Sequence, residues 1–304
     1  MRRFWRCCRR TCEQRSNVLE SMPELPEVEI LVRNLGPLLM NRKVRDVQVL
    51  RQRVIAPTSE KDLANALRGA TFVGLTRRGK YLLFSLRSRM RQEPVLLLGH
   101  LGMTGRMFLI DTATAAPKHA AVILDFGKSR FVFEDTRYFG RLTLDTEAIS
   151  RLGPEPLGLE FTTPYLASEL KRSSQAIKVK LLDQSLVAGV GNIYASEALF
   201  CARISPRIAA RRLKPAQVGR LRECIRDVLN RAIKLGSTLP LDFSGNGSGN
   251  GLFYYGAASG ETGADEERFS VYDRVGLPCA VCQTPIRRIV QAARSTFFCP
   301  HCQR

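Results

Sequence analysis

Gly153-Pro154-Glu155-Pro156-Leu157-Gly158 divides the chain into two parts of different character. Two glycines and two prolines in six residues do not support a helix or a strand, so this stretch is predicted to be a linker. Before it, short runs rich in β-branched and aromatic residues alternate with Gly, Asp and Ser. After it, the apolar residues recur at helical spacing. The sequence therefore predicts an α+β protein with a domain boundary at this linker.

The first part is predicted to be one helix followed by a β-sandwich or a barrel. Apolar residues from Val28 to Leu39 lie at helical spacing behind Pro23, so a helix is expected at the start. Seven or eight strands separated by turn residues are typical of a sandwich or a barrel. The expected strands are 44–50, 71–76, 80–86, 95–101, 107–110, 119–126 and 130–134.

The second part is predicted to be mainly helical. Its longest helix is expected at 215–235, with Val218, Leu221 and Ile225 on one face and Gly236 as its cap. Residues 244–251 alternate glycine with Ser or Asn, a composition typical of a flexible loop. The other expected helices are 164–171, 176–184 and 193–202.

The composition favours a nucleic-acid partner. Lys and Arg number 47 and Asp and Glu 28, which gives a net charge of +19. Residues 1–21 hold six Arg and two Glu, so removing them lowers the charge only to +15. A strongly basic body attracts a polyanion, although a solvated basic surface is the alternative. No apolar run approaches the roughly 18 residues that span a bilayer, so no membrane function is expected.

Four of the nine cysteines form a metal-binding pattern. Cys279-x2-Cys282 and Cys299-x2-Cys302 are separated by 16 residues, which is typical of a four-thiolate zinc site. Because all four positions are filled by protein, one structural Zn²⁺ that stabilises a β-hairpin is expected.

The remaining cysteines give no disulfide pattern. The length of the chain and the absence of a signal-peptide apolar region indicate a reducing compartment, and we expect a cytoplasmic protein. Cys201 and Cys224 lie in apolar periodic segments, so they are interpreted as small core residues.

Met22-Pro23-Glu24 has a chemical meaning that depends on where the chain begins. A proline that follows an initiator methionine can become a free secondary amine, whereas a proline inside a chain has an unreactive amide nitrogen. Residues 1–21 are therefore interpreted as a start codon assigned too far upstream. The alternative is an Arg-rich organelle presequence, which would still have to be cut at Pro23.

Gly189-Val190-Gly191-Asn192 precedes a predicted helix. Backbone N–H groups at a glycine turn and a helix start can bind one phosphate, with Asn192 as a further donor. A simple tight turn with an asparagine cap is the alternative.

Seven ordered motifs between Met22 and Arg304 resemble the bacterial formamidopyrimidine-DNA glycosylases, and the first of them is more similar to this branch than to the endonuclease VIII branch. They are Pro23-Glu24-Leu25-Pro26-Glu27-Val28-Glu29, Arg78-Gly79-Lys80-Tyr81-Leu82-Leu83, His100-Leu101-Gly102-Met103-Thr104-Gly105, Asp135-Thr136-Arg137-Tyr138-Phe139-Gly140, Leu152-Gly153-Pro154-Glu155-Pro156-Leu157, Gly189 to Glu197, and the four-cysteine finger.

The resemblance implies a DNA-repair enzyme that excises 8-oxoguanine and formamidopyrimidines from duplex DNA and then cleaves the strand by β,δ-elimination. It also implies an N-terminal β-sandwich, a helix-two-turn-helix domain and a zinc-finger hairpin. We expect a monomer in the cytoplasm, associated with the nucleoid. The expected segments are an extension at 1–21, a catalytic domain at 22–150, a linker at 151–159, a helix-two-turn-helix domain with a lesion loop at 160–265, and a finger at 266–304.

Four residues acquire catalytic or lesion-binding roles through this resemblance. Pro23 is the expected nucleophile toward C1′, because a secondary amine gives an iminium whose positive charge is fixed. Glu24 is expected to protonate the sugar ring oxygen and to move protons during elimination. Lys80 matches a lysine that contacts phosphate near the lesion, and Glu27 matches a glutamate near the lesion pocket. The competing interpretations are an exposed strand lysine and a first-turn helix charge.

Six further residues match DNA-contacting positions of the family. Lys178, Asn192 and Arg294 match residues that bind phosphates around the damaged nucleotide. An enzyme that turns a nucleotide out of the stack must fill the space it leaves. Met103, Arg137 and Phe139 match the three positions that fill it, although Met103 and Phe139 taken alone are typical core residues.

Two departures from the family pattern bear on specificity. Tyr138 and Thr136 replace a cation and a proline that relatives often carry, and 244–267 is longer and richer in glycine than the usual lesion loop. The alternatives to the repair enzyme are a non-catalytic binder of damaged DNA with a blocked Pro23, an oxidised-pyrimidine glycosylase of the endonuclease VIII type, and a zinc-finger transcription factor.

Overall fold

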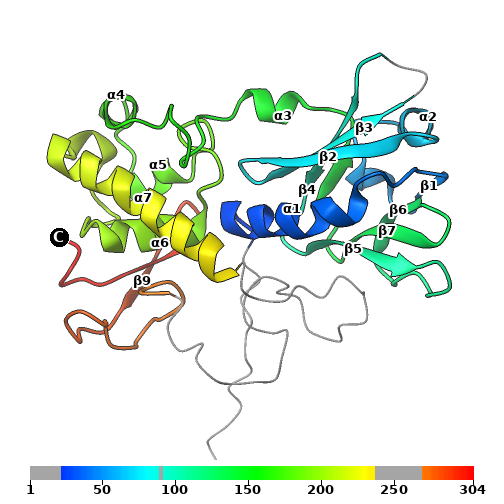
Figure 1. The fold of residues 1–304 in the computed structure, drawn as a ribbon. Helices are drawn as coiled ribbons and strands as arrows, with labels where there is room; N and C mark the ends of the chain where they lie inside the picture. The colour runs from blue at the N-terminus through cyan, green and yellow to red at the C-terminus, as the bar shows by residue number, and fades with distance from the viewer. Residues whose placement is uncertain (1–21, 89–91, 237–268) are drawn as a thin grey trace, which may run out of the picture.

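The computed structural model describes residues 22–88, 92–236 and 269–304, and in Figure 1 most of the strands gather on one side and most of the helices on the other. The expectations for residues 1–21 and for the loop at 244–267 lie outside the described residues. The finger lies on the helical side, below α6 (Asn192–Cys201) in this view.

The first part of the chain is a β-sandwich of two four-stranded antiparallel sheets, as the sequence predicts. In β3 every second residue is buried, which is the pattern of a strand with one face on a core. Phe72, Phe84 and Phe131 meet edge to face between the sheets. One sheet has the order β1 (Asp46–Val49), β6 (Ala120–Asp125), β7 (Ser129–Asp135), β5 (Gly105–Asp111), and the other β2 (Thr71–Arg78), β3 (Tyr81–Arg87), β4 (Val95–His100), β8 (Arg141–Thr143).

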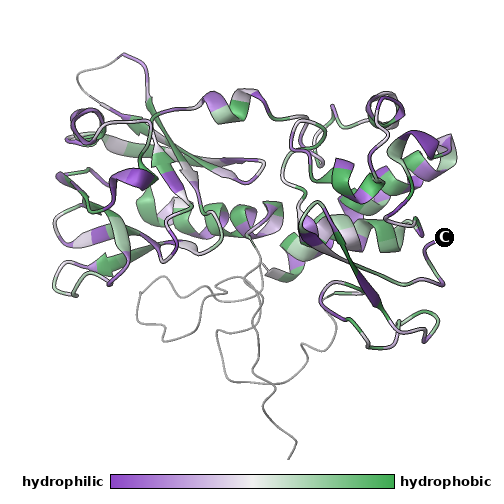
Figure 2. Ribbon diagram, turned by 180° about the vertical axis from the view of Figure 1, so that it is seen from behind, coloured by the Kyte–Doolittle hydropathy of each residue, from purple (hydrophilic) through white to green (hydrophobic). Residues whose placement is uncertain are grey.

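Helix α1 (Leu25–Leu39) connects the two parts of the molecule. Its first residue, Leu25, belongs to the core of the helical part, whereas Val28, Leu31, Leu35 and Leu39 belong to the core of the sandwich. The helix packs against both α7 and β2, and Figure 2 shows that it is hydrophobic along most of its length. The predicted boundary at the linker therefore separates the chain into two parts, but one helix contributes to both cores.

The second part contains the predicted helices, and the long one is confirmed as α7 (Pro215–Gly236), with Val218, Leu221 and Ile225 buried. Gly236 is the last residue of α7 and also the last described residue before 269, so its predicted role as a helix cap stays a prediction. α3 (Glu147–Ser150) lies in the connection between the two parts. The other helical elements are α4 (Thr163–Lys171), α5 (Ile177–Leu181), α6 (Asn192–Cys201) and η2 (Ala210–Arg212), and the sandwich also carries η1 (Gln52–Val54) and α2 (Glu60–Leu67).

Cys201 and Cys224 differ from the expectation of separate thiols. They belong to the helical core, as predicted, but a disulfide joins the end of α6 to the middle of α7. Their Cα atoms lie 5.7 Å apart, within the range that a disulfide spans. The two positions are 23 residues apart in the sequence and meet only because α6 and α7 pack together.

The linker is fixed to the sandwich by an ion-pair cluster. The carboxylate of Glu155 lies 2.7 Å from the guanidinium of Arg77 and 2.9 Å from that of Arg78. It also accepts the backbone N–H of Gly79 at 2.6 Å, so the turn between β2 and β3 is held against the linker. Because Lys80 follows in that turn, Glu155 also fixes the position of Lys80.

We expect Glu155→Gln to lower the free energy of unfolding by about 2 kcal/mol, because it leaves Arg78 without its carboxylate partner and leaves Arg77 with Glu29 alone. Urea denaturation measures the change. The control is Glu147→Gln, which removes a solvent-exposed pair with Arg151 and should cost less than about 0.5 kcal/mol. Equal effects of the two substitutions would contradict a structural role for the cluster.

The C-terminal segment forms the predicted hairpin of β9 (Arg287–Gln291) and β10 (Arg294–Phe298). Ala292 and Ala293 make its tight turn with positive φ values of 47° and 59°, a conformation that glycine or asparagine adopts more readily. Arg294 therefore leaves the turn at the tip of the hairpin.

Candidate active site and zinc site

A cavity of about 420 Å³ opens where the start of α1, the sandwich, α6 and the finger come together. Five residues that the sequence singled out lie in its wall, although they are spread over the whole chain. The lining residues are Met22, Glu24, Lys80, Met103, Asn192, Tyr272, Ala292, Ala293 and Arg294.

Glu24 is fixed in the wall by the start of α6. Its side-chain carboxylate accepts backbone N–H groups of Gly191 at 2.8 Å, Ile193 at 2.9 Å and Tyr194 at 3.3 Å. A helix start favours an anion because its first N–H groups lack partners inside the helix. A Cβ atom at residue 191 would collide with the Glu24 carboxyl group and with Lys80 Nζ, so a larger residue there would displace these side chains.

We expected the backbone N–H groups of Gly189–Asn192 to bind a phosphate, and this expectation is wrong about which anion they bind. The first N–H groups of α6 bind an anion, but this anion is the protein's own Glu24. The alternative of an asparagine cap is wrong as well, because Gly191 is the N-cap and makes no side-chain cap. Asn192 is the first residue of the helix, and its Oδ1 accepts from Lys178 Nζ at 2.6 Å.

Glu27 lies behind Glu24 and is not among the cavity-lining residues. Its carboxylate accepts the backbone N–H of Glu24 and the hydroxyl of Tyr194, each at 2.8 Å. Together the two glutamates form a capping box at the start of α1. In this structure Glu27 therefore supports the position of Glu24.

Three cations surround the Glu24 carboxylate. Burial lowers the pKa of Lys80, Glu24 and Glu27 raise it again, and Arg294 lowers it. Burial likewise lowers the pKa of Lys178 to about 8, with Glu24 opposing the shift and Arg294 and Lys80 adding to it. Lys80 lies in the turn between β2 and β3, so the exposed strand lysine of the competing interpretation is wrong. The cluster holds more positive than negative charge and suits a phosphate ligand.

Pro23 is buried between Met22, which lines the cavity, and Glu24. Met22, the residue before Pro23, therefore lies in the same wall as Glu24, Lys80 and Arg294. In a chain with Met22 attached, the proline nitrogen is an amide at this place.

Met103, Arg137 and Phe139 lie on two loops at one end of the sandwich. Met103 lies between β4 and β5 in the cavity wall, and the other two lie between β7 and β8. Phe139 is 44% exposed, and the guanidinium carbon of Arg137 lies 5.0 Å from the centre of its ring. Arg53 lies 5.6 Å from the same ring centre. The interpretation of Met103 and Phe139 as ordinary core residues is therefore wrong.

Sequence patterns missed three residues that build this site. Tyr272 lines the cavity and hydrogen-bonds to Asn192, and burial raises the pKa of its hydroxyl. Glu197 on α6 accepts the backbone N–H groups of Val271 and Tyr272, each at 2.9 Å, and so holds this segment in place. His100 accepts the N–H of Gly102 on Nδ1. Burial, then Lys80 and Arg141, lower the His100 pKa to about 4, so its imidazole is neutral.

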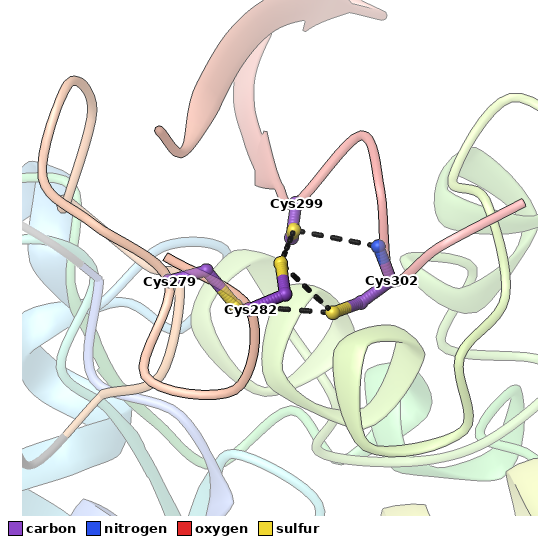
Figure 3. Close-up of side chains that lie close together, drawn as sticks. All are labelled: Cys279, Cys282, Cys299 and Cys302. Atoms are coloured by element: carbon purple, nitrogen blue, oxygen red, sulfur yellow. Dashed lines mark hydrogen bonds between the residues drawn. The ribbon is translucent and has the colours of Figure 1, made fainter. Parts of the chain in front are cut away.

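The four predicted cysteine ligands lie together in the finger, as Figure 3 shows. The sulfur atoms lie within 4.8 Å of one another, with Sγ distances of 3.4 Å for Cys282 and Cys299 and 3.9 Å for Cys279 and Cys302. A tetrahedral zinc ion with Zn–S bonds of about 2.3 Å requires sulfur atoms about 3.8 Å apart. The four thiols therefore fit one structural Zn²⁺ and leave no ligand position for a substrate.

We expect Cys282→Ser to abolish zinc binding and to weaken DNA binding at least about tenfold. The hairpin is too small to keep its fold without the metal, and it carries Arg294, which we predict to contact a phosphate; such a charged contact is worth about 1.5–3 kcal/mol. Metal analysis and a DNA-binding titration measure both effects. His301→Ala is the control, because His301 lies between two ligands without joining the sulfur cluster. Full zinc content in Cys282→Ser would contradict the assignment.

Three family models match consecutive parts of the chain. The N-terminal domain of formamidopyrimidine-DNA glycosylase matches residues 22–142, and the H2TH domain of the same enzyme matches residues 152–242. A zinc finger found in FPG and IleRS matches residues 276–304. The matches follow the order of sandwich, helices and finger in the structure.

Whole proteins are similar over the same range. Formamidopyrimidine-DNA glycosylase of Symbiobacterium thermophilum is 42% identical over 293 residues, covering 93% of this chain and 89% of the relative. The wild-type Lactococcus lactis Fpg, solved in complex with DNA containing an N7-benzyl-Fapy-dG, matches with a TM-score of 0.79 and 31% identity over 93% of this chain and 100% of that one. A MutM in complex with DNA containing a carbocyclic 8-oxo-G matches with a TM-score of 0.79 and 32% identity over the same shares.

A β-sandwich, an H2TH helical part and a four-cysteine finger around one charged cavity define the DNA glycosylase class to which these relatives belong. The chain belongs to the formamidopyrimidine-DNA glycosylase family. Among the described residues, no helix is long and apolar enough to cross a membrane.

Proposed function

We propose that this protein excises oxidised purines, 8-oxoguanine and formamidopyrimidines, from duplex DNA and then cleaves the strand through a Schiff base on Pro23. The observation that carries the proposal is the position of Pro23 beside a cavity in which Glu24, Lys80 and Arg294 converge. The solved relatives bound to DNA with a Fapy lesion or an 8-oxo-G analogue support the substrate class.

The reaction begins with the secondary amine that removal of Met22 exposes. Its nitrogen attacks C1′, and the damaged base leaves with the electrons of the glycosidic bond. Ring opening gives an iminium between Pro23 and the sugar. Loss of a proton from C2′ expels the 3′ phosphate, and a second elimination expels the 5′ phosphate. Each elimination draws electrons toward the iminium, which cannot become neutral by losing a proton from nitrogen.

Glu24 is the proposed acid and base of these steps. It follows Pro23 directly, and three backbone N–H groups at the start of α6 fix its carboxylate. The carboxyl group is therefore already in position to deliver a proton to the sugar ring oxygen. Lys80 lies in the same wall and carries the positive charge that a phosphate next to the lesion needs.

The remaining cations and loop residues are proposed to hold the DNA. Asn192 and Arg294 line the cavity and are proposed to bind phosphate. Lys178 is proposed to act with them, although it is fully buried and does not line the cavity, because its Nζ donates a hydrogen bond to Asn192. Met103, Arg137 and Phe139 are proposed to fill the space that the everted nucleotide leaves. Glu27 supports Glu24 from behind.

The domain limits remain proposals: a catalytic domain at 22–150, a linker at 151–159, a helix-two-turn-helix domain with a lesion loop at 160–265 and a finger at 266–304. The extension at 1–21 is proposed to be absent from the active form. We also propose that the protein acts as a monomer in the cytoplasm, where it associates with the nucleoid.

The second candidate is a non-catalytic binder of damaged DNA. One observation favours it: with Met22 in place, the Pro23 nitrogen is an amide at the edge of the cavity. Such a protein would keep every DNA contact and lack the nucleophile. Mass analysis of the N-terminus of the purified protein separates the two candidates, because only the enzyme begins at Pro23.

Duplexes that carry 8-oxoguanine or thymine glycol test the substrate class. The proposed enzyme releases 8-oxoguanine faster than thymine glycol and leaves phosphates on both sides of the gap. Faster release of thymine glycol would instead assign the protein to the oxidised-pyrimidine glycosylases.

A further inference from the structure

The loops that carry Met103 and Arg137 begin at neighbouring strand ends. Gly105 is the first residue of β5 and pairs with Asp135, the last residue of β7. Residues 101–105 therefore enter the sheet where residues 135–140 leave it. We call these two segments the paired loops.

A single buried carboxylate joins the paired loops. Asp135 is fully buried, and its Oδ1 accepts the hydroxyl of Thr104 at 2.5 Å and the backbone N–H of Arg137 at 3.1 Å. Its Oδ2 accepts the backbone N–H of Gly140 at 2.7 Å. One bond therefore crosses to the first loop and two close the second loop around Arg137 and Phe139.

Backbone contact makes the junction tight. A Cβ atom on Gly102 would lie 2.6 Å from the Gly140 nitrogen and 2.8 Å from the Phe139 carbonyl carbon, so the two backbones touch. The Thr104 hydroxyl also lies 3.3 Å from the N–H of Arg137. Neither loop can change its path without disturbing the other.

We propose that Asp135 and Thr104 are positioning residues that hold the paired loops as one rigid unit, so that Met103, Arg137 and Phe139 enter the duplex together. This inference rests on the proposed function, because it assumes that these three side chains replace the everted nucleotide. Neither Asp135 nor Thr104 lines the cavity, and both act through the loops they hold.

The physical reason is the cost of extrusion. Turning a paired nucleotide out of the stack costs a few kcal/mol, and the side chains that fill the gap recover it only if they arrive in the correct geometry. Fixing the loops beforehand means that the ordering is part of folding and is not repeated at each encounter with DNA. An abasic site needs less of this help, since it has no base to unpair or unstack.

The test is a set of conservative variants in the chain that begins at Pro23. Thr104→Val removes the bridging hydroxyl at nearly constant volume, and Thr104→Ser restores it. We expect Thr104→Val to slow single-turnover excision of 8-oxoguanine from duplex about tenfold, with cleavage of a preformed abasic site changed less than about twofold. Thr104→Ser should recover most of the rate. Asp135→Asn should act in the same direction and more strongly.

Thr112→Val is the matched control, because Thr112 lies just beyond the opposite end of β5 and donates a comparable bond to Gly127. Its excision rate should match that of the unsubstituted protein. Unfolding curves of all variants verify that each is folded at the assay temperature. Wild-type excision by Thr104→Val, or an equal loss on the abasic duplex, would overturn the proposal.

A fluorescent base analogue next to the lesion separates this proposal from the proposed chemistry. Its fluorescence rises when the side chains enter the stack, before any covalent step. Thr104→Val should slow this rise about tenfold, whichever residue of the protein reacts with the sugar. If the parent protein shows the rise and cuts no strand, the proposed function fails. If the fluorescence rises at an unchanged rate in Thr104→Val, the positioning role of Thr104 is contradicted and the proposed function is not affected.

Discussion

The chain that begins at Met1 is expected to bind a duplex containing 8-oxoguanine and to leave it uncut, whereas the chain that begins at Pro23 cuts it. In the longer chain the lone pair of the Pro23 nitrogen is delocalised into the carbonyl of Met22, so no nucleophile stands at the cavity. Every residue that we propose to contact DNA is the same in both. Strand cleavage, followed on a gel with the two purified forms, should fall to the uncatalysed level in the longer one.

A chain that begins at Met22 is the matched control for this comparison. It adds only Met22 to the active form. Any difference in strand cleavage therefore comes from the Pro23 nitrogen, which is an amide and no longer an amine, and from the volume of the Met22 side chain. It should be as inactive as the full chain. Mass spectra must show that each sample keeps its intended first residue. Full cleavage by intact protein that still begins at Met1 would contradict the role of Pro23.

The second large effect is expected from Glu24→Gln. The substituted amide keeps the size of the side chain, but it cannot supply a proton to the sugar ring oxygen, and its NH₂ group meets the N–H donors of α6. General acid–base catalysis contributes about 10²- to 10⁴-fold, so excision should fall by that amount. DNA affinity should change far less, because Lys80, Lys178 and Arg294 remain.

Glu29→Gln is the control for Glu24→Gln. Glu29 lies on the same helix but pairs with Arg33 and Arg77, each at 2.8 Å, away from the cavity lining. The substitution should cost stability without changing the chemical step. Equal losses of excision in the two variants would indicate a disturbed helix α1 and would argue against Glu24 as the acid.

The fold was largely predictable because its signals are local. The linker is marked by its own prolines and glycines, the strands by short runs rich in β-branched and aromatic residues, and α7 by one apolar face. Helix α2 was missed because it is only eight residues long and Leu63 and Leu67 are its only large apolar residues, although Ser59 and the acidic first turn are typical of a helix start. The sequence also did not predict that α1 contributes to two cores, because an apolar face of a helix does not indicate which elements pack against it.

Sequence motifs singled out Glu24, Lys80, Met103, Asn192 and Arg294, which the structure places around one cavity, but they did not reveal the connections between these residues. Glu24 and Ile193 are 169 positions apart, and only the fold shows that a carboxylate of α1 occupies the start of α6. The glycine turn was correctly interpreted as an anion site, but the sequence could not reveal that the protein supplies the anion. Tyr272 and Glu197 carry no spacing signal, because their contact forms between α6 and a segment distant in sequence.

Cys201 and Cys224 illustrate the same limit. Each sits in an apolar periodic stretch, so each was interpreted correctly as a core residue. Their pairing depends on the packing of α6 against α7, which no local pattern reports. The four zinc ligands were predictable because each pair lies within one turn, and the hairpin between the pairs brings them together.

Borohydride reduction during the reaction with an 8-oxoguanine duplex tests the mechanism most directly, because it converts a Schiff base into a permanent link between protein and sugar. Proteolysis and mass spectrometry of the product then locate the linked residue. We predict a deoxyribose adduct on the nitrogen of Pro23 as the first residue of the chain. An adduct on Lys80, Lys178 or any other lysine, or strand cleavage with no adduct, would contradict this mechanism.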